Sequence, residues 1–188
     1  GGRFLRAGPA YGGSCFPKDT KGLVVTGDKQ NINLSIVKSV IRSNHNRKLL
    51  LARRVEKILG KNLKHKKISV LGVTFKPNTD DMRDSSSLIM IPYLLKKGAL
   101  VSYYDPSGKK KIFDKFKNLK YYNNIGKVCR KSDLVILHTE WDEFKSIDFK
   151  KLVKNKNFKL YDLRNLYNQD EMIRKKIKYY SVGRSNIN

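Results

Sequence analysis

From Lys67 to Val182, short apolar runs alternate with helical or loop segments, and this alternation restricts the possible folds more than any other feature. The runs are KKISVLGV, ALVSYYDP, LKYY, DLVILH, KLYDL and IKYYSV. Strands that alternate with helices imply a parallel sheet with helices on both faces, and right-handed crossovers make such a sheet doubly wound. We therefore predict an α/β fold. Ligands of such sheets bind at the carboxyl ends of the strands, where FKP, YYDP, HTEW and DLRN fall.

The residues before the sheet predict two helices. A shorter helix runs from about Pro17 to Thr26 and ends near Gly27. Asn33 is the predicted N-cap of a long helix that stops at Gly60. Its apolar residues recur at helical spacing, and the polar stretch SNHNRK interrupts them. They are Leu34, Val37, Ile41, Leu51, Val55, Ile58 and Leu59.

Two domains follow from this pattern. Residues 1–62 hold a loop around Cys15 and the long helix, and residues 63–188 hold the Rossmann-like doubly wound sheet. The segment 61–66 is the predicted hinge. An ordinary surface helix remains an alternative interpretation of the long helix.

Cys15 lies in the segment GPAYGGSCFPKDTKGL, where glycines precede the cysteine and Pro17 follows it. Proline suits the first turn of a helix, so the thiol lies near the positive end of a helix dipole. That position and the neighbouring Lys18 favour the thiolate. Asp19 follows four residues after the thiol, one helical turn away. The strip therefore presents a nucleophile, a cation and a possible base. The alternatives are a buried, inert Cys15 and an Asp19 that only stabilises the helix dipole.

The composition bears on the cellular compartment of the protein and on membrane association. The 188 residues carry two cysteines, Cys15 and Cys129, without C-x-x-C spacing, which favours a reducing compartment, and we expect the cytoplasm. Cys129 is interpreted as structural. No run approaches the roughly 20 apolar residues of a membrane span, and the first ten residues do not resemble a signal peptide, so we expect no membrane partner.

The net charge of +25 raises the possibility of nucleic-acid binding. The lysines are spread over nearly every segment, and no zinc-finger, helix-turn-helix or RNP-like pattern accompanies them. We therefore expect solvated lysines and no specific nucleic-acid partner.

The acidic run around Asp80, Asp81 and Asp84 is predicted to cap N–H groups or pair with arginine, and we predict no metal site. The three histidines show no metal-ligand spacing and are interpreted as surface or packing residues. They are His45, His65 and His138.

Five motifs carry a resemblance to a known family. They are GGRFLRAGPAYGGSCFPKDTKGL, LGVTFKPNTDDMRDSSSL, YYDP, TEW and DLRN, and in order and spacing they resemble the second half of UDP-glucose 6-dehydrogenases in the UDP-glucose/GDP-mannose dehydrogenase family. The family's N-terminal dinucleotide domain opens with G-x-G-x-x-G, and that pattern does not occur in these residues. We therefore expect a C-terminal fragment or part of a split enzyme, inactive alone.

The resemblance implies the oxidation of UDP-glucose to UDP-glucuronate with two NAD. Cys15 forms a covalent thiohemiacetal and then a thioester, and Asp19 assists water or proton transfer. Lys18 and Arg83 correspond to cofactor residues. The residues that correspond to substrate-binding positions are Phe4, Leu5, Arg6, Ala7, Gly8, Tyr11, Gly12, Lys76 and Arg164, the last reaching a neighbouring subunit.

The partners implied by the resemblance are a UDP-sugar, a second copy that forms a homodimer through the long helix, and a separate chain with the NAD domain. Two alternatives remain open. One is a non-catalytic remnant that binds UDP-sugar or dimerises. The other is a dehydrogenase of another nucleotide sugar, UDP-N-acetylmannosamine or GDP-mannose.

Overall fold

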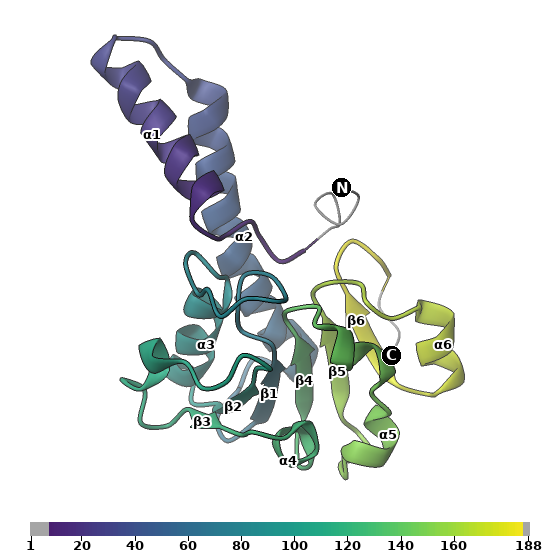
Figure 1. Ribbon diagram of the computed structural model, residues 1–188. Helices are drawn as coiled ribbons and strands as arrows, with labels where there is room; N and C mark the ends of the chain where they lie inside the picture. Colours follow the sequence, from purple (N-terminus) through teal and green to yellow (C-terminus); the bar gives the residue numbers. More distant parts are fainter. Residues whose placement is uncertain (1–7, 186–188) are drawn as a thin grey trace.

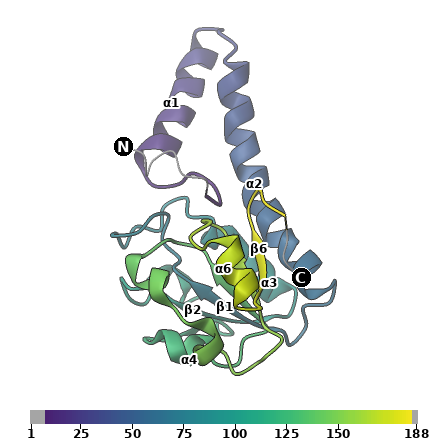
Figure 2. The same ribbon diagram turned by 90° about the vertical axis from the view of Figure 1, so that its right-hand side faces the viewer.

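The computed structural model describes residues 8–185 and shows a helical arm standing on an α/β domain (Figure 1). The arm consists of α1 (Cys15–Lys29) and the first half of α2 (Ser35–Leu59). The two helices lie side by side and are joined at the tip of the arm (Figure 2). The substrate residues expected at Phe4, Leu5, Arg6 and Ala7 lie outside the described residues.

The α/β domain is built on a six-stranded sheet in the order β3-β2-β1-β4-β5-β6, with every neighbouring pair parallel. This order is that of the Rossmann fold. The sequence prediction of a doubly wound parallel sheet is confirmed, and each of the six apolar runs contains one strand. The strands are β1 (Lys67–Leu71), β2 (Leu100–Tyr104), β3 (Lys120–Tyr121), β4 (Leu134–Leu137), β5 (Lys159–Asp162) and β6 (Lys178–Ser181).

Shorter helices connect the strands. They are α3 (Ser87–Lys96), η2 (Lys111–Phe113), α4 (Ile125–Cys129), η3 (Asp142–Ser146), α5 (Phe149–Leu152) and α6 (Gln169–Arg174). Pro92 lies inside α3, which continues through it.

Two apolar cores cover the two faces of the sheet. Because neighbouring side chains of a strand point in opposite directions, Ile68 and Val70 of β1 join one core and Leu71 joins the other. The first core packs against α2 and α3, and the second against α4, η3, α5 and α6. The second half of α2 therefore belongs to the core of the sheet domain.

Both arm helices differ from the sequence prediction at their ends. Helix α1 begins at Cys15, so the thiol is in the first turn, and it continues past Gly27 to Lys29. A Cβ on Gly27 would lie 2.8 Å from the Leu34 side chain, so this glycine serves close packing and does not end the helix. Asn33 is not the N-cap of α2: Leu34 takes that position without a side-chain hydrogen bond.

No helix in the described part of the chain has the length and apolar character needed to cross a bilayer.

Candidate functional site

The carboxyl edge of the sheet, next to the base of the arm, gathers most of the predicted site residues that are described. Strands β1 and β4 are neighbours at the centre of the sheet order, where the chain reverses its direction of winding. The loop of residues 72–86 after β1 and the segments after β4 and β5 meet at this edge, and the loop before α1 packs against them.

The Cys15 thiol is exposed at the first residue of α1. The Ser14 hydroxyl is 3.7 Å from its sulfur, and Pro17 is buried in the same turn. The neighbouring ion pair joins Lys18 Nζ to Asp19 Oδ1 at 3.6 Å, and both side chains are mostly exposed. The thiol therefore lies at the N-terminus of a helix, as predicted, although the helix begins at Cys15 and not at Pro17.

Two polar side chains of α2 hold the loop before the thiol. The Asn44 side chain accepts a hydrogen bond from Tyr11 N–H (3.0 Å) and donates one to the Tyr11 carbonyl (3.1 Å). Arg47 donates to the carbonyls of Gly8 and Pro9, each at 3.0 Å. The polar stretch that interrupts the apolar pattern of the long helix is thus the surface that binds the thiol loop.

A third side chain of α2, Lys48, connects this helix to the loop after β1 in the sheet domain. It is buried, donates to the Asp84 carbonyl at 2.7 Å and pairs with the Asp84 carboxylate at 3.6 Å. Lys21 of α1 pairs with the other oxygen of that carboxylate at 3.7 Å. Burial lowers the pKa of Lys48, while Asp84 opposes that shift. Asp84 therefore joins both arm helices to the loop after β1.

Sequence reasoning missed Asn44, Arg47 and Lys48. Arg47 and Lys48 follow Asn44 by three and four residues, which places all three on one face of a helix, and this spacing is the signal that could have found them. The contacts themselves depend on tertiary structure.

Two glycines allow the thiol loop to touch the loop after β1. A Cβ on Gly12 would lie 2.7 Å from the Asp84 carbonyl oxygen. Gly13 has a φ of +85°, donates from its N–H to the Arg83 carbonyl at 2.8 Å and lies against the Phe75 ring. A side chain at either position would force the two loops apart.

Arg164, in the segment after β5, is directed into the protein. Its guanidinium donates to the carbonyls of Phe75 (2.8 Å) and His138 (3.1 Å), and it pairs with Glu140 at 2.8 Å. Burial lowers the pKa of Arg164, and the Glu140 charge opposes this. A Cβ on Gly8 would lie 2.6 Å from Arg164 Nη1, so these two predicted site residues are neighbours.

Two predicted cations are exposed at this edge. Lys76 lies over the Phe75 ring, with its nitrogen 5.5 Å from the ring centre. Arg83 donates from Nε to Oδ1 (3.0 Å) and from Nη2 to Oδ2 (2.8 Å) of Asp81, the pairing with arginine that the sequence predicted for this acidic run. The pKa of Arg83 is raised, mainly by its hydrogen bond to Asp81. The Arg83 carbonyl accepts a hydrogen bond from Gly13 N–H, two residues before Cys15.

A cavity of about 310 Å³ lies between α1, α2 and Asp84. Its lining contains four basic side chains, Lys21, Arg42, His45 and Lys48, and a single carboxylate. The arm therefore presents a positively charged recess beside the thiol helix.

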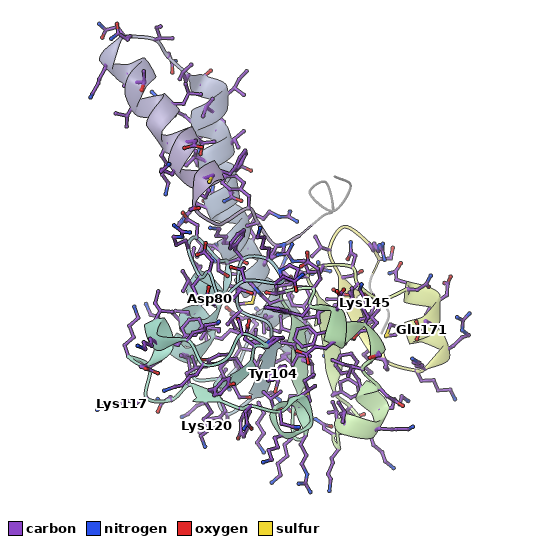
Figure 3. The ribbon with its side chains drawn as sticks, in the orientation of Figure 1. Asp80, Tyr104, Lys117, Lys120, Lys145 and Glu171 are labelled. Atoms are coloured by element: carbon purple, nitrogen blue, oxygen red, sulfur yellow. The ribbon has the colours of Figure 1, made fainter. Side chains whose placement is uncertain are left out.

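Within residues 8–185, no group of three or more His, Cys, Asp or Glu side chains has the arrangement of metal ligands. Asp80 is exposed and lies near the base of the arm (Figure 3). Asp81 and Asp84 form ion pairs instead.

His138, which directly follows β4, is a buried packing residue between the loop after β1 and the segment after β4. Its ring nitrogens lie 2.7 Å from the Ser86 hydroxyl and 3.0 Å from the Thr139 hydroxyl. Burial lowers the pKa of His138 to about 3, and the charges of Arg164 and Lys48 act in the same direction. The ring is therefore neutral in the folded protein at neutral pH.

Acidification is expected to destabilise the protein through this ring. Between about pH 6.5, the ordinary value, and the folded pKa, only the unfolded chain binds the proton, so the free energy of unfolding falls as pH decreases, by about 1.4 kcal/mol per pH unit from His138. Urea denaturation at pH 7, 6 and 5 measures this slope. In a His138→Gln variant the free energy of unfolding should fall less steeply as pH decreases, by about 1.4 kcal/mol per pH unit. Equal slopes for the two proteins would contradict the assignment.

Comparison with known proteins places both parts of the chain. A family model described as the UDP binding domain of the UDP-glucose/GDP-mannose dehydrogenase family matches residues 69–169, and a model of the central domain of that family matches residues 1–46. The UDP-glucose 6-dehydrogenase of Rhizobium meliloti (strain 1021) is 40% identical over 185 residues, which are 98% of this chain and 42% of the relative. That of Rickettsia bellii (strain RML369-C) is 41% identical over 186 residues, which are 97% of this chain and 43% of the relative.

Solved structures agree with this placement. A UDP-glucose dehydrogenase from the hyperthermophilic archaeon Pyrobaculum islandicum superposes with a TM-score of 0.79 at 29% identity, over 96% of this chain and 39% of that one. A GDP-mannose dehydrogenase from Pseudomonas aeruginosa, at 23% identity, shares the fold with a TM-score of 0.74, over 95% of this chain and 41% of that one. The chain thus spans about two fifths of the length of the relatives it matches.

Proposed function

Because the chain belongs to the UDP-glucose/GDP-mannose dehydrogenase family, we propose that it supplies the thiol site and the UDP-sugar domain of a UDP-glucose 6-dehydrogenase. The observation that supports this most is the exposed Cys15 at the start of α1, next to a loop that contacts the carboxyl edge of a Rossmann-like sheet. A nucleotide bound at that edge would lie within the same group of loops as the thiol.

In the proposed reaction the C6 alcohol of the sugar is first oxidised to an aldehyde. The Cys15 thiolate adds to the aldehyde carbon, and the resulting thiohemiacetal is oxidised to a thioester. Water then releases the carboxylate and restores the thiol, assisted by Asp19 as a base. Covalent capture keeps the reactive aldehyde from leaving between the two oxidations.

NAD would accept one hydride in each of the two oxidations. The described residues fit only one end of this cofactor. Lys18 and Arg83 are exposed cations around the thiol and suit a phosphate or carboxamide approaching it. The sheet itself does not fit a dinucleotide, because Asp105, at the position that often holds the ribose, is buried and accepts hydrogen bonds from Val73 N–H and Ser107 N–H. The proposal therefore assigns the dinucleotide seat to a part of the enzyme outside these 188 residues.

Lys76, Arg164 and the backbone of Gly8, Tyr11 and Gly12 are proposed to line the substrate site. Lys76 is exposed and suited to a phosphate or sugar hydroxyl. Arg164 holds the carbonyl of Phe75 and is close to Gly8, so within this chain it positions the loops around the substrate. Its reach toward a neighbouring subunit remains a prediction from the resemblance.

Further parts of the proposal concern assembly and setting. They are a homodimer through the long helix, a cytoplasmic location, a separate chain with the NAD domain, and a division into residues 1–62 and 63–188 in which the second half of α2 packs against the sheet of the second part.

Complementation tests the proposed activity. We expect the 188-residue chain alone to produce no NADH above background from UDP-glucose and NAD. A chimera that adds the part of the Rhizobium meliloti enzyme outside the match should produce two NADH for each UDP-glucuronate. Absorbance at the NADH band and product analysis measure both. NADH formation by the chain alone would overturn the assignment of the dinucleotide seat, and a folded chimera without activity would overturn the enzyme proposal.

Calorimetry separates the alternative substrates. Binding of UDP-glucose in preference to UDP-N-acetylmannosamine and GDP-mannose supports the proposed sugar. Binding of UDP-glucose together with an inactive, folded chimera would identify a non-catalytic UDP-sugar module.

A further inference from the structure

The basic residues of the sheet domain gather at one end of it, although they are dispersed along the sequence. In a parallel sheet every segment that leads into a strand lies at the same edge, opposite the carboxyl ends. The segments that lead into the six strands hold 21 of the 41 Lys and Arg residues of the chain and one acidic residue, Asp133. We call this surface the basic end, formed by residues 60–67, 96–100, 115–120, 127–133, 150–159 and 174–178.

Most of these cations face solvent. Lys66 and Lys159 are partly buried, and the other members are exposed. Lys117 and Lys120 extend from the lower part of the molecule in Figure 3, whereas Asp80 lies above them, near the base of the arm. The lysines are therefore scattered in the sequence, but the parallel sheet brings many of them to one end of the domain.

Little negative charge offsets the basic end. Ion pairs engage Lys97 with Glu56, Lys151 with Asp148 and Lys175 with Glu171. The carboxylate of Asp133 accepts hydrogen bonds from Lys67 N–H and Asn155.

Many of the remaining acidic residues of the sheet domain follow the carboxyl ends of strands. These are Asp80, Asp81, Asp84, Asp105, Glu140, Asp142, Glu143 and Asp162. The domain is therefore electrically polarised, with the proposed reaction site at the less basic end.

We propose that the basic end binds the surface of an anionic phospholipid membrane, independently of the proposed enzymatic function. This peripheral binding differs from the sequence-based expectation of no membrane partner, which rested on the absence of a membrane-spanning run. Two properties of the basic end support this proposal: its positive charge, which complements anionic headgroups, and its width. Six strands spaced about 4.8 Å apart make an edge roughly 24 Å wide, which is suited to many headgroups at once. Juxtamembrane lysines contribute about 1 kcal/mol each near an anionic leaflet.

The composition of the basic end favours lipid over nucleic acid. Its cations are lysines except for Arg130 and Arg174, so it has few of the planar forks that read bases. Among residues 8–185 the one exposed Phe, Tyr or Trp side chain is Phe16, which is on the arm, so the basic end offers few aromatic rings for stacked bases, namely those of His65 and the half-buried Phe116. Leu100 (48% exposed) lies in the basic end and Ile173 (52% exposed) borders it, where each can insert among headgroups.

Vesicle flotation of the 188-residue chain tests the proposal. We expect binding to phosphatidylcholine vesicles that contain phosphatidylglycerol, and none to vesicles of phosphatidylcholine alone, at physiological ionic strength. A basic-end variant with Lys64, Lys131, Lys156 and Lys178 each changed to Gln should bind at least about tenfold more weakly. A control variant with Lys29, Lys109, Lys111 and Lys145 changed to Gln removes the same charge elsewhere and should stay within about twofold. Circular dichroism confirms that both variants are folded.

Three results would overturn the proposal. The first is the absence of binding to the phosphatidylglycerol vesicles. The second is equal weakening of the basic-end and control variants, which would reduce the effect to net charge. The third is tighter binding to an oligouridylate RNA than to the vesicles at the same salt, with the same loss in the basic-end variant, which would make the surface a nucleic-acid site.

Discussion

Replacement of Cys15 by serine is expected to lower the turnover of the chimeric enzyme by about 10⁴-fold or more. A hydroxyl in place of the exposed thiol cannot form the thioester through which the second oxidation passes. The variant should also form less than one UDP-glucuronate for each aldehyde produced, because the aldehyde is no longer held. Initial rates of NADH formation, with chromatographic analysis of the products, measure both effects.

The second cysteine provides the matched control. Cys129 is fully buried in the second core, far in sequence from the arm. A Cys129→Ala variant should keep turnover within about threefold and lose some stability, because it opens a small cavity. If Cys15→Ser kept most of the activity while it remained folded and bound UDP-glucose, the covalent mechanism would be wrong.

Iodoacetamide is expected to modify Cys15 at least about 100-fold faster than Cys129 in the folded chain. Cys15 is exposed at a helix N-terminus, whereas Cys129 has no exposed surface. Burial also raises the pKa of the Cys129 thiol to about 12, so its thiolate is scarce at neutral pH. Mass spectrometry of the two tryptic peptides, taken over time, gives both rates in one experiment.

Denaturation supplies the internal reference for that comparison. In concentrated urea the chain is unfolded and both cysteines are exposed to solvent, so the two labelling rates should converge. Comparable rates in the folded chain, or faster labelling of Cys129, would contradict the placement of the two thiols.

The fold could be predicted from the sequence because each strand is an apolar run with its own boundaries. Runs such as DLVILH satisfy both the local preference for strand and burial on two faces, so local and tertiary effects agree. Helix ends were harder. Glycine often ends a helix, but α1 continues past Gly27 to Lys29. The absence of a Cβ at Gly27 lets the Leu34 side chain pack closely against the helix.

The position of the thiol could also be predicted, because the residues that set it are contiguous. The contacts that hold the thiol loop could not be predicted. Asn44, Arg47 and Lys48 are separated from the loops they bind by more than thirty residues, and only the folded arm shows which backbone groups they meet. The direction of Arg164 into the protein likewise depends on carbonyl groups from two other strands' loops.

Helix α2 is one continuous rod whose first half lies beside α1 and whose second half is buried under the sheet. Its side chains hold both the segment before Cys15 and the loop after β1. The Cys15 loop and the carboxyl edge of the sheet are therefore linked through one helix, and we expect them to move together. In the proposed enzyme, an opening that admits substrate is then expected between this unit and the part that binds NAD.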